Sequence, residues 1–115
     1  MLKTIPELLQ DATKSVRKIS ASEANTEMQG NKGLLIDVRE PSEHLDKAAQ
    51  GALNIPRGLL EMKMLEMEKD PQRPIYLHCA TSARAILSAE QLARVGYTAV
   101  SVITCDINTI QQETK

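Results

Sequence analysis

Cys79 and Arg84 are the two residues whose types and spacing could do chemistry together. Cys79 directly follows the mostly apolar run 75–78, four small or polar residues separate it from Arg84, and a segment rich in alanine continues to residue 93. This order predicts a strand, a tight loop and a helix. At such a junction the backbone N–H groups and the positive end of the helix dipole point at the end of the strand, which favours the nucleophilic thiolate form of a thiol placed there. Cys79 is therefore the candidate nucleophile.

A single free cysteine is more commonly a buried structural residue than a nucleophile. The position of Cys79 favours catalysis, because the residue lies at the strand-to-helix turn rather than within the strand, with an arginine five residues further on. We expect its sulfur to be ionised and reachable from solvent at the mouth of a parallel sheet.

The segments around this loop predict an α/β fold. Two patterns with capping-box spacing, Thr4-x-x-Glu7 and Ser20-x-x-Glu23, each begin a helical segment, and apolar runs ended by a charge or a turn predict buried strands. Strands alternating with helices imply a mainly parallel central sheet of four to five short strands flanked by helices on both sides. The expected elements are helices over about residues 5–18, 21–29, 41–45, 59–69 and 82–95, and strands over about 34–38, 53–55, 75–78 and 99–103.

Length and composition indicate one domain of 115 residues, with residues 1–19 as a helical extension packed on the domain formed by residues 20–115. The net charge of −1 comes from 14 basic and 15 acidic residues spread along the chain, which predicts neither a nucleic-acid nor a membrane partner. Two cysteines and an N-terminus without an apolar core favour a cytoplasmic location.

Four segments resemble the rhodaneses, the family of single-domain sulfurtransferases, and they occur in the order typical of that family. Together they cover roughly residues 20–105, so the resemblance identifies residues 20–115 as a rhodanese-like domain. The segments are 34–43 (LLIDVREPSE), 51–56 (GALNIP), 79–84 (CATSAR) and 96–100 (GYTAV).

The resemblance implies sulfur transfer through a persulfide. The Cys79 thiolate would attack the outer sulfur of a small donor such as thiosulfate and pass that sulfur to cyanide or a thiol, with a protein sulfur acceptor as a further possibility. No metal or organic cofactor is implied, because loop amides can hold the anionic persulfide. The binding amides would come from Ala80, Thr81, Ser82, Ala83 and Arg84.

Two arginines could bind the anionic donor. Arg84 would pair with its oxyanion or brace the loop, and the hydroxyls of Thr81 and Ser82 could donate to the same anion or cap the following helix. Arg57 follows the short strand 53–55 and is a candidate second cation, although a solvated turn residue is an equally good reading of this position.

Further residues are expected beside the site. Asp37 and Arg39 resemble the Asp-x-Arg of the family and should form an ion pair that braces the rim. Cys105 stands where the family commonly has a Gly-Gly pair after the last strand. One hypothesis is that Cys105 resolves the Cys79 persulfide as a disulfide or relays its sulfur; the alternative is a small buried residue.

His78 precedes Cys79, as in the His-Cys-x5-Arg loop of tyrosine and dual-specificity phosphatases and related arsenate reductases. Here the cysteine and arginine enclose only four residues, one fewer than a loop around phosphate needs. Strand side chains alternate, so His78 should point away from Cys79 and be hydrogen-bonded, while His44 should face solvent. The alternatives to a sulfurtransferase are a non-catalytic regulatory or sulfur-carrier module on the same fold and, less favoured, a cysteine-dependent phosphatase or arsenate reductase.

Three departures from the family pattern affect this prediction. Ser82 and Ala83 occupy the loop positions where many members place a glycine, and a left-handed backbone at Ala83 would cost about 1 kcal/mol. Lys47-Ala48 stands in place of the usual Gly-His, and the tail 106–115 lacks the customary tryptophan-bearing helix.

Overall fold

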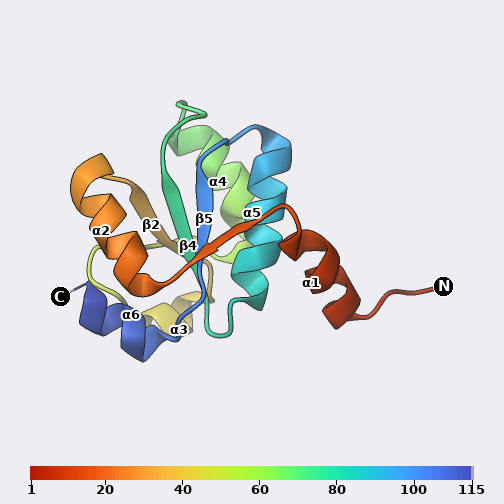
Figure 1. Ribbon diagram of the computed structural model, residues 1–115, viewed down its shortest axis with the longest axis horizontal. Helices are drawn as coiled ribbons and strands as arrows, with labels where there is room; N and C mark the ends of the chain where they lie inside the picture. The colour runs from red at the N-terminus through yellow and green to blue at the C-terminus, as the bar shows by residue number, and fades with distance from the viewer. Residues whose placement is uncertain (115) are drawn as a thin grey trace.

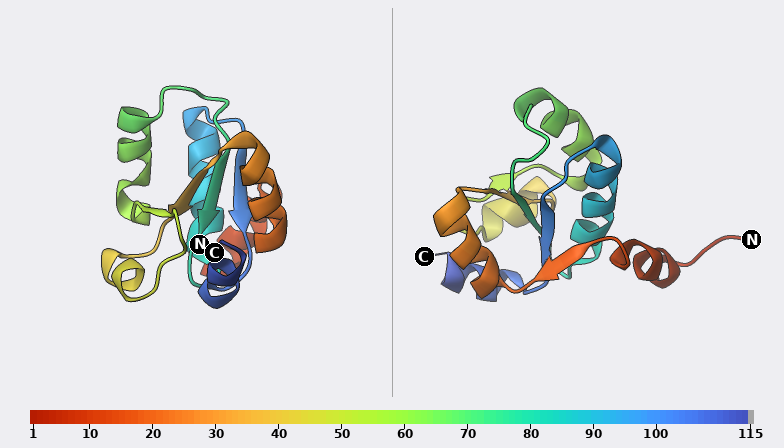
Figure 2. Two further views of the ribbon diagram at one scale, coloured as in Figure 1. Left: turned by 90° about the vertical axis from the view of Figure 1, so that its left-hand side faces the viewer. Right: turned by 45° about the horizontal axis from the view of Figure 1, so that its top comes forward.

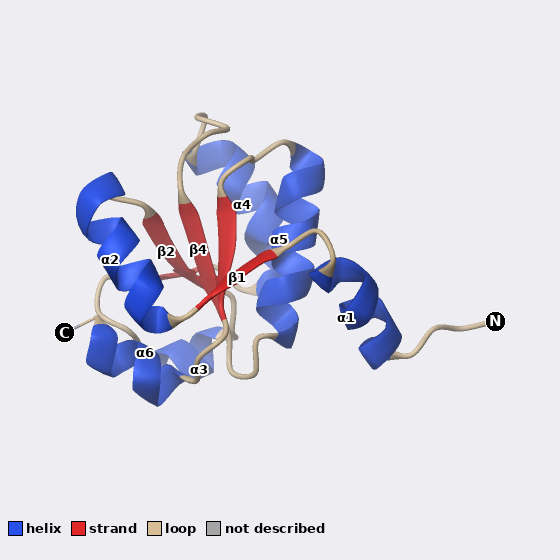
Figure 3. Cartoon of the chain, in the orientation of Figure 1, coloured by secondary structure: helices blue, strands red, loops and turns tan. Residues whose placement is uncertain are grey.

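The computed structural model describes residues 1–114 and contains one five-stranded, all-parallel sheet (Figures 1 and 3). The strand order across the sheet is β1-β5-β4-β2-β3, so β4 lies at its centre. The predicted parallel α/β fold is confirmed. The strands are β1 (Arg17–Ile19), β2 (Leu34–Asp37), β3 (Leu53–Asn54), β4 (Ile75–His78) and β5 (Val100–Ile103).

Helices cover both faces of the sheet (Figure 2). On one face, α1, α4 and α5 pack over a large core cluster that includes Leu77 of β4; on the other, α2 and α6 pack over a second cluster that includes Tyr76. Successive β4 side chains therefore enter different cores, which explains why the whole strand is buried and reads as a continuous apolar run. The helices are α1 (Ile5–Thr13), α2 (Ala21–Asn31), α3 (Pro41–Asp46), α4 (Leu60–Met67), α5 (Ala83–Val95) and α6 (Ile107–Glu113), with a 3₁₀ turn, η1, at Arg57–Leu59.

The predicted first helix, residues 5–18, is too long. Helix α1 ends at Thr13, and residues 17–19 form β1, which pairs in parallel with the outer side of β5. Apolar Val16 and Ile19 fit a helical spacing, but strand pairing decides the conformation of so short a segment. We predicted that this segment packs on the domain. In the structure α1 does contact it, since Ala12 is fully buried in the larger core cluster. The domain boundary at residue 19 stays a prediction, although β1 contributes to the sheet.

The tail does form a helix, contrary to our expectation, although it carries no tryptophan. Asp106 caps α6 by accepting a 2.9 Å hydrogen bond from the backbone N–H of Thr109, and Ile110 is fully buried in the second core cluster. An N-cap carboxylate and one buried isoleucine are thus enough to dock the tail. Lys115, the last residue of the predicted domain, lies outside the described residues. Within residues 1–114, no helix has the length and apolar character needed to cross a membrane.

Candidate active site

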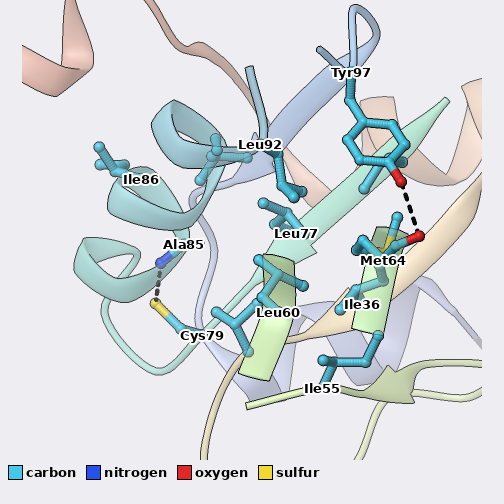
Figure 4. Packing of buried hydrophobic residues seen from close by; sticks show 14 of the residues in the cluster. Ile36, Ile55, Leu60, Met64, Leu77, Cys79, Ala85, Ile86, Leu92 and Tyr97 are labelled. Carbon is cyan, nitrogen blue, oxygen red and sulfur yellow. Dashed lines mark hydrogen bonds between the residues drawn. The ribbon is translucent and has the colours of Figure 1, made fainter. Parts of the chain in front are cut away.

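The predicted strand, loop and helix around Cys79 are present. Strand β4 ends at His78, Cys79 follows it, and α5 begins at Ala83. The backbone N–H of Ala85 donates to Cys79 Sγ at 3.3 Å (Figure 4). Ala85 is the third residue of α5, so its N–H is one of those that a helix leaves without an intrahelical partner. The sulfur therefore lies at the positive end of the α5 dipole.

The amide that reaches the sulfur lies one residue beyond the predicted cradle of residues 80–84. Sequence reasoning placed the cradle in the loop and overlooked Ala85. The signal was available, because the first three or four N–H groups of any helix are free to bind an acceptor, and residue 85 falls in the first turn of the predicted helix.

The expectation that the Cys79 sulfur is reachable from solvent is wrong for this conformation. Cys79 is 0% exposed and belongs to the larger core cluster together with Leu77 and Ala85. The side chain lies on the face that α4 and α5 cover, and its sulfur is directed at the first turn of α5 (Figure 4). Ala80 and Thr81 are exposed, so the loop itself lies at the surface. A reaction of Cys79 with a dissolved reagent therefore needs a conformation in which this sulfur is more exposed.

The strained residue of the loop is Ser82, not Ala83. Ser82 has φ +66° and ψ −13°, a left-handed conformation that costs a residue with a Cβ about 1 kcal/mol or more. Its carbonyl accepts the backbone N–H of Ile86 at 2.8 Å, whereas its side chain makes no capping hydrogen bond. The left-handed turn brings the chain from β4 directly into α5 and so places the Ala85 N–H against the sulfur.

Arg84 is held by a carboxylate from α3. Its Nη1 and Nη2 atoms donate to Glu43 Oε1 at 2.8 Å and Oε2 at 3.0 Å, a bidentate pair in which both side chains are about one third exposed. The hydrogen bonds from Arg84 are the main reason that the pKa of Glu43 falls to about 2, and the same contact raises the pKa of Arg84. Sequence reasoning missed Glu43 as a partner, since 41 residues separate the two.

The Asp37–Arg39 ion pair that the sequence predicted is present, and the His44 ring also contacts the Asp37 carboxylate. Arg39 Nε and Nη2 donate to Asp37 Oδ1 at 2.9 Å and Oδ2 at 2.8 Å, and both residues are buried. Burial raises the pKa of Asp37, but the hydrogen bonds from Arg39 and His44 outweigh it, so that the pKa is lowered. We had expected His44 to face solvent. Instead, its Nδ1 lies 2.9 Å from Asp37 Oδ2.

The His78 ring is not hydrogen-bonded, contrary to the prediction. It is fully buried opposite Asp37 in the β2–β4 register, and neither ring nitrogen has a partner within residues 1–114. Burial, followed by the positive charge of Arg39, lowers its pKa to about 4, while the Asp37 carboxylate opposes this shift. His78 is therefore neutral at physiological pH, and the alternation along β4 puts it on the other side of the sheet from Cys79.

Two further candidate residues, Arg57 and Cys105, make no hydrogen bond to the Cys79 sulfur within residues 1–114. Arg57 donates to Glu61 Oε1 at 2.7 Å, while its backbone N–H donates to the carbonyl of Val38 at the end of β2. Cys105 packs against the second core cluster, on the face opposite Cys79, and its sulfur accepts the backbone N–H of Ala21 at 3.3 Å. Both cysteines are free thiols. This placement counts against a direct disulfide, although the relay hypothesis stays a prediction.

Metal ligands do not cluster near this loop. Residues 1–114 contain no group of three or more histidine, cysteine, aspartate or glutamate side chains that could hold a metal ion together.

Comparison with known proteins places these features in a family context. The family model of the rhodanese-like domain matches residues 20–113. An uncharacterized Bacillus subtilis protein, YqhL, is 39% identical over 60% of this chain and 53% of its own length. A protein named sulfurtransferase from Allochromatium vinosum is 33% identical over 56% of this chain and 58% of its own length. The matches therefore cover little more than half the length of either curated relative.

Two solved structures resemble the whole fold. The polysulfide-sulfur transferase homodimer of Wolinella succinogenes superposes with a TM-score of 0.75 at 26% identity, covering 93% of this chain and 81% of that one. A Rhodopseudomonas palustris protein of unknown function, described as a possible tyrosine phosphatase, gives a TM-score of 0.76 at 21% identity, with 97% and 92% coverage. At that identity the second likeness shows the fold alone.

Proposed function

This chain belongs to the rhodanese-like domain family, and from that premise we propose that it is a sulfurtransferase whose Cys79 carries sulfane sulfur as a persulfide. The observation that carries the proposal is the hydrogen bond from the first turn of α5 to the Cys79 sulfur, with Arg84 in the same turn. The relative named sulfurtransferase and the similar fold of the Wolinella succinogenes polysulfide-sulfur transferase support the reaction class.

In the loading step, the Cys79 thiolate attacks the outer sulfur of a donor. With thiosulfate, the sulfur–sulfur bond of the donor breaks, sulfite leaves with its electron pair, and a new sulfur–sulfur bond forms on Cys79. The persulfide is anionic, and the α5 dipole together with the Ala85 N–H stabilises the charge that remains on it. No redox partner is needed, because the outer sulfur of the donor is transferred at its own oxidation level and the unloading step restores the Cys79 thiolate.

In the unloading step, a thiophilic acceptor such as cyanide or a thiol attacks the outer sulfur of the persulfide, and the Cys79 thiolate leaves. Both steps need the sulfur to become accessible. The loop between β4 and α5 supplies that motion in our proposal, since Ala80 and Thr81 are exposed and Ser82 is in a strained conformation. A protein thiol as acceptor and a cytoplasmic location remain parts of the proposal.

A non-catalytic module on the same fold is the second candidate, and the burial of Cys79 is the observation that favours it. Such a module would keep the structure and bind a partner, but it would not load sulfur. A phosphatase or arsenate reductase is less favoured, because the four residues between Cys79 and Arg84 form too small a loop for a tetrahedral phosphate.

The experiment is a loading and transfer assay on the complete chain. The protein is incubated with thiosulfate, intact mass reports one added sulfur atom, and cyanide is then added to release thiocyanate. We expect Cys79→Ser to lose both signals. Cys105→Ser is the matched control, since it removes the other thiol, and it should keep them. If wild-type protein takes no sulfur from thiosulfate or from a persulfide donor, the proposed sulfurtransferase activity is wrong and the non-catalytic module is favoured.

A further inference from the structure

Every arginine that the sequence assigned to the site is bound by an acidic side chain in the structure. Arg84 pairs with Glu43, Arg57 with Glu61, and the buried Arg39 with Asp37. A site that binds a strongly anionic donor normally presents an uncompensated cation to it. Here each of these arginines is neutralised by a carboxylate. We therefore expect the site to disfavour a strongly anionic donor.

Arg84, which Glu43 binds, lies in the first turn of α5, next to the Ala85 amide that binds the Cys79 sulfur. Glu43 uses both terminal nitrogens of the guanidinium, the same fork that a sulfonate end of a donor would need. Arg84 also lies in the field of a second carboxylate, Glu40. An anionic donor must therefore displace Glu43 and then remain beside two carboxylates.

Protonation of Glu43 does not free Arg84 under ordinary conditions. The pKa of Glu43 is held at about 2, chiefly by its hydrogen bonds from Arg84, so the carboxylate stays charged well below neutral pH. The competition between Glu43 and an anionic donor is therefore a permanent property of the site at physiological pH.

We propose that Glu43 is a specificity-determining residue of the loading step, and that it selects a persulfide carried on an organic thiol over doubly charged thiosulfate. This inference rests on the proposed function. In the favoured step, the Cys79 thiolate attacks the terminal sulfur of R–S–S–H, the donor's sulfur–sulfur bond breaks, and a new sulfur–sulfur bond forms on Cys79. The donor leaves as the thiolate R–S⁻, which takes the persulfide proton to become R–SH and leaves Cys79 as the anionic persulfide, so atoms, protons and electrons balance.

The first test measures charge selection without any sulfur transfer. Iodoacetate and iodoacetamide alkylate a thiolate by the same displacement and differ in charge, and peptide mass spectrometry resolves Cys79 from Cys105. Glu43→Gln keeps the size of the side chain and removes its charge. We expect this change to raise the iodoacetate-to-iodoacetamide rate ratio at Cys79 at least about fivefold, because one carboxylate next to Arg84 is neutralised.

Two controls separate charge from structure. Glu43→Asp keeps the charge and should keep a ratio near that of the wild type. Glu68→Gln removes the partner of Arg73, an ion pair elsewhere in the fold, and should leave the ratio unchanged. Thermal unfolding curves establish that each variant is folded. A ratio that Glu43→Gln leaves unchanged, or a Cys79 that neither reagent reaches in any variant, overturns the inference.

The second test uses two donors, thiosulfate and the persulfide of the uncharged thiol N-acetylcysteamine. Wild-type Cys79 should load faster from the persulfide, and Glu43→Gln should reduce that preference at least about fivefold. If Cys79 loads sulfur but the preference does not change, only the role of Glu43 is wrong. If neither donor loads Cys79 while the alkylation ratio still shifts, charge selection stands and the proposed function is wrong.

Discussion

Cys79 and Cys105 follow neighbouring parallel strands, β4 and β5, and each sulfur accepts one backbone N–H at 3.3 Å from the first turn of a helix. Judged by that contact alone, the two thiols are alike. They differ in their surroundings: Cys79 is fully buried among the side chains under α4 and α5, whereas Cys105 is partly exposed on the opposite face beside α2.

The different surroundings of the two thiols show that one hydrogen bond from a backbone amide is not enough to identify a reactive cysteine. The Cys79 loop contains a left-handed residue and delivers Arg84, which α3 holds through Glu43. In α2, the capping box between Ser20 and Glu23 supplies the N-terminal cap beside Cys105. A left-handed residue in the turn and an arginine held by a carboxylate from another helix are what set the first region apart.

The largest expected difference between the two regions is in the pH dependence of stability, and it comes from the residue that precedes each cysteine. Thr104 is satisfied by the carbonyl of Ile19, whereas His78 is buried without a partner and its pKa is lowered from 6.5 to about 4. The unfolded chain binds a proton near pH 6.5 and the folded chain does not, so stability present above that pH is lost as the pH falls toward 4, by roughly 3 kcal/mol.

Chemical denaturation between pH 7 and 4 measures this loss. His78→Leu should remove most of it, and His44→Gln, which changes the other histidine beside Asp37, serves as the comparison. If the stability of the wild-type protein does not change between pH 6.5 and 4, the assignment of a neutral buried His78 is wrong.

Removing the guanidinium beside Cys79 should reduce sulfur loading strongly. We expect Arg84→Ala to lower the loading rate constant about a hundredfold, the usual loss when one charged donor is removed from a reacting anion. Arg73→Ala is the matched control, because it also breaks an Arg–Glu pair, with Glu68, away from the loop. Loading kinetics by intact mass measure both variants, and equal rates would show that Arg84 only braces the fold.

The two thiols should differ in their reaction with a neutral reagent. Cys105 is partly exposed and Cys79 is closed, so iodoacetamide should modify Cys105 at least about tenfold faster, because Cys79 has to wait for a local opening. Peptide mass spectrometry over a time course measures the two rates. Faster modification of Cys79 would mean that its loop is mostly open in solution.

The smallest expected effect concerns the backbone of the two turns. Ser82→Gly should stabilise the protein by up to about 1 kcal/mol, because glycine adopts the left-handed conformation without strain and the Ser82 side chain makes no cap hydrogen bond. Thr104→Gly in the second turn should destabilise it, since Thr104 has no positive φ and its hydroxyl donates to Ile19. Urea unfolding compares them, and a destabilising Ser82→Gly contradicts the strain at this position.

The parallel sheet and the Cys79 loop could be predicted because their signals are local. Strands buried on both faces read as apolar runs, and a cysteine followed by small residues and a helix former indicates a sharp strand-to-helix turn. β1 escaped prediction because its three residues owe their conformation to pairing with β5 rather than to their own pattern.

The charge state and the accessibility of the site could not be predicted from spacing. The pairing of Arg84 with Glu43 joins residues 41 positions apart, and only the docking of α3 beside the loop brings them together. The burial of Cys79 likewise depends on which core cluster its side chain enters. For the same reason, the sequence could not show that His78 lacks a hydrogen-bond partner.

The pairing of β1 with β5 matters if the protein is shortened to residues 20–113, the segment that the family model matches. That cut would delete β1 together with α1, and β5 would become the border of the sheet, with its outward peptide groups stripped of their pairing. A bare border of this kind invites intermolecular strand addition. The shortened protein should therefore be prone to self-association, which β1 prevents in the longer chain by pairing with the outer side of β5.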